Sequence, residues 1–177
     1  MNLHNALDSE HSKAQALRIV DYIGRSDERF SELLEFVTGE NKRLAQRAAW
    51  VISHCAMQTP EVVEPHLFDL LQFIRKGEHH DAIKRNTMKA ASILELRGRV
   101  SGLAADLAFE ILSSPDEAIA TRAYSLTVLE RLCKAEPELA PELRLVMDHM
   151  SGPKLPAALK ARIRGARKVI DNLSPPT

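Results

Sequence analysis

Apolar residues recur with a helical period along almost the whole chain. In residues 41–57 they follow the spacing i, i+4, i+7, i+8, i+11, which places side chains on one face of a helix; they are Leu44, Ala48, Val51, Ile52 and Cys55. A second apolar stripe occupies residues 60–76, after a polar break that ends in a proline suited to a first helical turn. The two segments together predict a helical hairpin.

The hairpin pattern returns at a nearly fixed period. Four residues lie near the start of corresponding helices, at separations of 39, 36 and 40 residues. They are Leu44, Ile83, Ile119 and Leu159. The second helices also repeat: the segment that starts at Pro60 resembles the one that starts at Pro137, and each contains a further proline, Pro65 or Pro141, which predicts a shared bend. A period of this length indicates stacked helical repeats, because one hairpin cannot bury its apolar stripe alone.

These patterns predict nine helices and no strand. The helices span residues 10–24, 26–39, 41–57, 60–76, 80–97, 101–114, 116–134, 137–150 and 155–173. We therefore expect an all-α fold, a right-handed α-solenoid of about four helical hairpins closed by a C-terminal helix. It would form a single domain over residues 1–177, with residues 1–8 and 174–177 as frayed tails.

Composition supports a globular chain and gives little electrostatic guidance. Hydrophobic residues make up 45% and charged residues 27%, which disfavours disordered and membrane classes. Lys plus Arg equals Asp plus Glu at 24 each, so no overall field attracts nucleic acid or an anionic membrane. Cys55 and Cys133 are too few for a disulfide framework or a zinc site, and we expect buried, reduced thiols. With no signal-like N-terminal segment, a cytoplasmic location is expected.

Several sequence blocks resemble a known family. The blocks RAAWVISHC, TRAYSLTVLERL, PELRLVMDH and ALKARIRGARKVIDNL are similar to small bacterial HEAT-repeat proteins of unknown function, and the resemblance runs from about residue 41 to residue 173. The resemblance implies hairpins of HEAT or armadillo type and a surface for protein binding. Some members carry the name adenylosuccinate lyase; true lyases of that kind are much longer and use a flexible loop with Ser and Met that this sequence lacks.

Charge alternates between the predicted helix layers. From residue 41 on, the first helices of the hairpins are basic, up to +5 over residues 153–173, whereas the second helices are acidic, with −4 over residues 26–40 and over residues 101–117. If the second helices line a groove, as is usual in HEAT solenoids, the groove would suit a basic partner. The alternative is that these charges form ordinary solvated faces.

A basic stripe and one aromatic residue are the candidate partner-binding residues. The stripe comprises Lys160, Arg164, Arg167 and Lys168, on the helix face opposite Leu159 and Ile163. It could instead be the polar outer face that a terminal repeat needs. Trp50 shares a helical edge with Arg47 and could anchor a partner, or it could pack between repeats. A further set, expected to form ion pairs between repeats, is Arg47, Arg122 and Arg162.

The sequence offers little for catalysis. It contains no Gly-rich phosphate loop, nucleophile elbow or His-Glu zinc helix. His54 and Cys55 are helical neighbours that point ~100° apart, so they cannot form a nucleophile and base pair. The pair His79 and His80 could suggest a metal, but we expect helix entry with Asp81 as the cap. We predict no catalytic residue, metal or cofactor.

Three functional hypotheses follow. The first is a non-catalytic adaptor that binds a protein partner. The second is a nucleic-acid-binding protein similar to the helical-repeat alkylpurine DNA glycosylases, which the acidic second helices disfavour. The third is a small-molecule lyase, which would require a deep pocket with convergent polar side chains.

Overall fold

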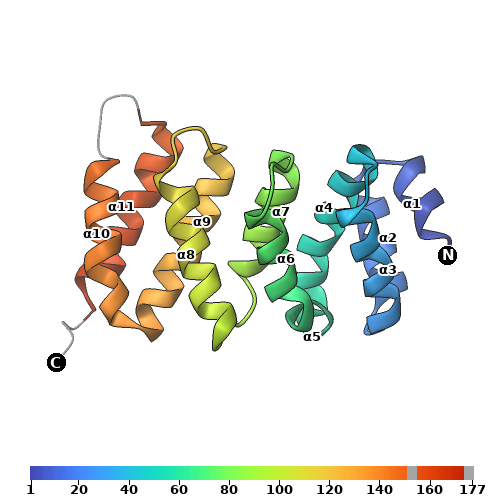
Figure 1. Cartoon of the computed structure of the whole chain (residues 1–177), viewed down its shortest axis with the longest axis horizontal. Helices are drawn as coiled ribbons and strands as arrows, with labels where there is room; N and C mark the ends of the chain where they lie inside the picture. Colours follow the sequence, from blue (N-terminus) through green and yellow to red (C-terminus); the bar gives the residue numbers. More distant parts are fainter. Residues whose placement is uncertain (151–154, 174–177) are drawn as a thin grey trace. The chain divides into compact units, whose positions relative to one another are not determined.

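The computed structural model describes residues 1–150 and 155–173, and every regular element in these residues is helical (Figure 1). The all-α fold class predicted from the sequence is therefore confirmed. The predicted tail at residues 174–177 lies outside the described residues. The elements are α1 (Leu3–Ser9), α2 (Lys13–Ile23), α3 (Asp27–Thr38), α4 (Lys42–Gln58), α5 (Pro60–Val63), η1 (Glu64–His66), α6 (Leu67–Arg75), α7 (Asp81–Ala91), α8 (Arg99–Ser113), α9 (Ile119–Ala135), η2 (Pro137–Leu139), α10 (Ala140–His149) and α11 (Ala157–Asp171).

The chain forms two compact units, residues 1–95 and residues 96–177. In unit 1, α4 is the central helix and packs against α1, α2, α3 and α7. In unit 2, α9 packs against α8 and α11, and α10 packs against α8 and α11. The division falls between α7 and α8, which were expected to form the third hairpin. A single domain over residues 1–177 stays a prediction.

The predicted N-terminal tail is wrong, because residues 1–8 contain most of helix α1. Leu3 and Leu7 are buried, and α1 packs against α2 and α4. The side chain of Asn2 caps the helix by accepting a hydrogen bond from the backbone N–H of Asn5 at 2.9 Å. Seven residues are too few for a convincing helical period, so the apolar pattern did not reveal this helix.

The repeat register at α9 differs from the predicted one by two residues. Leu44, Ile83 and Leu159 are each the third residue of their helix and are buried. Ile119 is instead the first residue of α9 and is 46% exposed, and the third position belongs to Thr121, which is fully buried.

The pattern of buried residues along α4 and α9 supports the corrected register. The order of buried and half-buried residues in 121–129 is the same as in 44–52. The sequence alignment of the repeats placed Arg122 at the position of Arg47. The burial pattern shows that it does not occupy that position. It takes the place that Ala45 has in α4.

Prolines and a serine set the other helix boundaries. The helix predicted over residues 60–76 is divided by the 3₁₀ turn η1, which contains Pro65, whereas Pro141 lies in the first turn of α10, so the two prolines do not have the shared role predicted for them. The helix predicted over residues 80–97 ends at Ala91. There the hydroxyl of Ser92 donates to the carbonyl oxygen of Lys89 at 2.7 Å, and the chain leaves the helix.

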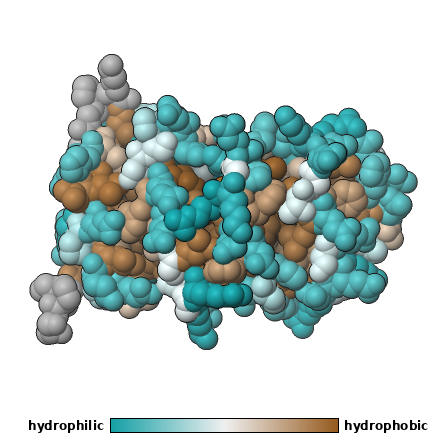
Figure 2. Space-filling model, viewed as in Figure 1, coloured by the Kyte–Doolittle hydropathy of each residue, from teal (hydrophilic) through white to brown (hydrophobic). Residues whose placement is uncertain are grey.

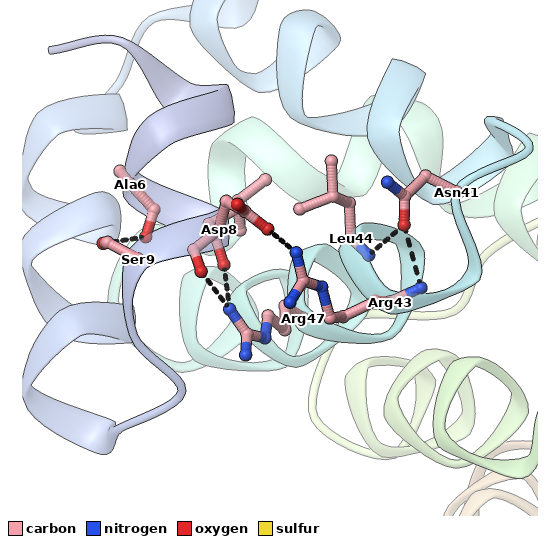
Figure 3. A network of polar contacts seen from close by, with 8 residues as sticks. Ala6, Asp8, Ser9, Asn41, Arg43, Leu44 and Arg47 are labelled. Carbon is pink, nitrogen blue, oxygen red and sulfur yellow. Dashed lines mark hydrogen bonds and ion pairs between the residues drawn. The ribbon is translucent and has the colours of Figure 1, made fainter.

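Helix α1 is attached to α4 by an arginine that binds backbone carbonyls (Figure 3). Nη1 of Arg47 donates to the carbonyl oxygens of Leu7 at 2.6 Å and Asp8 at 2.8 Å. Both carbonyls belong to the last turn of α1, where no helical partner remains and the helix dipole is negative. Arg43 forms an exposed ion pair with the side chain of Asp8. The ion pair between repeats that was predicted for Arg47 is thus replaced by contacts to carbonyls.

We predict that Arg47→Met lowers the free energy of unfolding by about 1–3 kcal/mol, because two carbonyls at the end of α1 lose a charged donor. Urea denaturation of the full chain measures this loss. Hydrogen exchange of the α1 amides should accelerate in the same variant, because α1 loses its attachment to α4.

Arg43→Met is the matched control. It removes an arginine from the same helix, but one whose ion pair is exposed, and it should cost less than about 1 kcal/mol. Equal losses in the two variants would contradict the assignment.

Candidate docking cavity

Unit 2 contains a cavity of about 1050 Å³ at the ends of three helices. It is bordered by the α8–α9 connection, the first turn of α9, the last turns of α10 and the residues before α11. The lining residues that matter for its chemistry are Ile119, Arg122, Leu145, Val146, His149 and Met150.

The walls of this cavity expose large apolar side chains. Ile119 is 46% exposed and Leu145 is 57% exposed, so the described residues cover neither of them completely. Figure 2 shows apolar surface among polar side chains over the C-terminal helices. Leu145 was missed at the sequence level. A helical projection could have identified it, because it lies about 200° around α10 from the buried Leu143.

Arg122 also lines this cavity, and its cationic side chain is buried. Its side chain is only 7% exposed, and Nε donates to the carbonyl oxygen of Leu112, in the last turn of α8, at 3.0 Å. Burial lowers the pKa of the guanidinium. The ion pairs between described residues do not include Arg122, so the pairing predicted for it is not found.

The titratable groups of the cavity are not arranged for acid–base catalysis. Nδ1 of His149 lies 2.8 Å from the carbonyl oxygen of Leu145 in its own helix, and Glu117 already has a partner. Among the described residues, no group of three His, Cys, Asp or Glu side chains could hold a metal ion. The cavity thus presents exposed apolar side chains and one buried cation.

The predicted basic stripe on α11 is only partly free. Arg164 and Lys168 are exposed, whereas Arg167 forms an ion pair with Asp148 of α10 at 2.5 Å. Lys160 is half-buried and has a partner of its own. The opposite, apolar face of the helix is buried as expected.

Arg162 is the member of the predicted arginine set that does form an ion pair between repeats. From α11 it reaches two residues of α9, Glu130 at 3.4 Å and the hydroxyl of Thr127 at 2.8 Å. The prediction is confirmed for this residue.

Trp50, the other predicted contact residue, is half-buried between two histidines of unit 1. Its ring centroid lies 4.9 Å from that of His11 and 5.5 Å from that of His54. His54 is 6% exposed, and its Nε2 has no hydrogen-bond partner. Burial, and then the charges of Lys89 and Lys13, lower the pKa of His54. A contact between Trp50 and a partner stays a prediction.

The histidine pair at the start of α7 has a structural role. His80, rather than the predicted Asp81, is the N-cap, and its Nδ1 accepts a hydrogen bond from the backbone N–H of Ala82 at 3.1 Å. Asp81 is the first helical residue, where its charge suits the helix dipole. His79 lies with Nε2 2.8 Å from the carbonyl oxygen of Phe73.

Both cysteines are buried free thiols, as predicted. Burial raises the pKa of Cys55 to about 12 and that of Cys133 to about 11, so their reactive thiolate forms are rare at neutral pH.

Among the described residues, no helix has both the length and the apolar character that a membrane span requires.

The depressed pKa of His54 predicts that unit 1 loses stability in mild acid. The unfolded chain protonates this residue below its ordinary pKa of about 6.5, while the folded chain resists protonation until lower pH, so stability falls as pH falls through that window. His54→Gln should reduce the loss measured by urea denaturation between about pH 7.5 and about pH 5.5. His4→Gln, at an exposed position, should leave it unchanged. A wild-type loss retained in full by His54→Gln would contradict this.

Comparison with protein families finds a match over most of the chain. The family model described as HEAT repeat domain matches residues 3–170, nearly the whole chain. Comparisons with curated proteins and with solved structures find no match. The stacked helical hairpins and the extent of the family match agree, and the chain belongs to the HEAT repeat domain family.

Proposed function

We propose that this protein is a non-catalytic scaffold that binds a protein partner through the cavity of unit 2. One observation carries the proposal: two large apolar side chains, Ile119 and Leu145, stand exposed on the walls of a cavity of about 1050 Å³. Exposed apolar surface around a cavity is typical of places where a partner docks.

The size and chemistry of the cavity suit a folded or extended protein segment. Covering an exposed aliphatic side chain contributes about 25 cal/mol per Å² of apolar surface, and a partner would cover both walls together. The volume is at the upper end of the range for ligand pockets, about 300–1,000 Å³, so it has room for several side chains.

The rival hypotheses have less support. A lyase needs convergent polar groups, and the cavity has mainly apolar walls with one buried cation. Nucleic-acid binding needs a basic field, and the chain has equal numbers of acidic and basic residues. A cytoplasmic location remains our expectation, since free buried thiols suit a reducing compartment.

Leu145→Gln should strongly reduce capture of the partner. In affinity capture from lysate with quantitative mass spectrometry, proteins retained by the wild-type chain should fall about tenfold with this variant, because an apolar contact is replaced by a polar one without changing charge. A photo-crosslinking residue at position 145 should label the same proteins.

Met57→Gln is the matched control. Met57 is 47% exposed at the end of α4 in unit 1, and its replacement makes the same change of polarity away from the cavity. Retained proteins that are lost equally with both variants, or with neither, would refute the proposed docking site.

A further inference from the structure

We propose that the cavity of unit 2 recognises an acidic side chain of the partner segment, next to a large apolar one, and that the guanidinium of Arg122 binds this carboxylate. The inference rests on the proposed docking function and specifies its ligand chemistry. It depends on the observation that Arg122 has no carboxylate partner in the described part of the chain.

A guanidinium in this environment is costly without a negative partner. Arg122 is 7% exposed, and a buried charge is normally paired or fully hydrogen-bonded. Of its five N–H donors, Nε is engaged by a neutral carbonyl, that of Leu112 at 3.0 Å. The side chain lines the cavity, so a ligand there can reach the terminal amino groups.

The other two arginines of the predicted set each contact two acceptors within the chain. Arg47 donates to two carbonyls of α1, and Arg162 contacts a hydroxyl and the carboxylate of Glu130. Arg122 has neither a second carbonyl nor a carboxylate among the described residues. It also occupies the position that Ala45 fills in α4, so the repeat itself does not require an arginine there.

The remaining groups of the cavity fit an apolar segment that carries one acidic residue. Carboxylates bind arginine through two parallel N–H···O bonds, which fixes the orientation of the ligand. Ile119 and Leu145 supply apolar walls, and Glu117, the acidic lining residue, is already engaged. A free small carboxylate would leave both walls uncovered, which favours a protein segment.

Selection from a random dodecapeptide library on phage tests this recognition with the full chain as bait. The selected peptides should be enriched in Asp or Glu within two positions of a large apolar residue. They should bind Arg122→Gln and Leu145→Gln poorly and Met57→Gln as well as wild type. A selection that yields no binders, or binders without acidic enrichment, would overturn the inference.

A synthetic version of the strongest peptide gives the quantitative test. Replacing its acidic residue by the amide should weaken binding to the wild-type chain about tenfold and should change binding to Arg122→Gln much less. The Nε–Hε NMR signal of Arg122 in the wild-type chain should shift with the acidic peptide and not with the amide, which keeps the test decisive if the variant unfolds.

The two proposals fail differently. Peptides that depend on Leu145 but are insensitive to the amide replacement would leave the docking site standing and refute the role of Arg122. Peptides that are insensitive to both Leu145→Gln and Arg122→Gln would refute both.

Discussion

The structure depends on the burial of one apolar helix face against the next helix. α4 shows this constraint most clearly, because it packs against five other helices of unit 1 and buries most of its length. Three alanines, Ala45, Ala48 and Ala49, lie on its buried surface and allow neighbouring helices to approach closely. No hairpin of this kind is stable alone, since its apolar stripe would remain in water. The cavity of unit 2 differs from these packed faces, because its exposed residues Ile119 and Leu145 lie outside the buried faces of α9 and α10.

Much of this architecture could be predicted from the sequence because the helical period is strong and the breaks are chemically marked. Ser26 and Asn41 cap the helices that follow them, as expected of residues whose side chains accept from the first turn. The register of α9 could not be found in this way. The buried third position holds a polar threonine, Thr121, so an alignment of apolar residues selects the exposed Ile119 instead. Burial there depends on packing, which periodicity does not encode.

The candidate site was less accessible to sequence analysis than the fold. The sequence indicated α11 as the binding element, because its positive charges are spaced to lie on one helix face. In the structure, however, Arg167 forms an ion pair with Asp148. The cavity is assembled from residues that lie between positions 113 and 156, on different elements. Arg122 was recognised as a recurring arginine, yet only the fold shows that no acidic side chain of the described residues pairs with it. Single residues on separate helices acquire a common role when packing brings them together.

The buried hydroxyl of Thr121 has no hydrogen-bond partner, at a position where the other repeats place leucine or isoleucine. An unpaired hydroxyl in the interior costs free energy and gives back less dispersion than a longer aliphatic chain. The first turn of α9 is consequently held less tightly than a leucine or isoleucine at this position would hold it. The same turn carries Ile119 on the wall of the docking cavity, so a rearrangement of the wall there loses less packing than it would with an aliphatic residue at position 121.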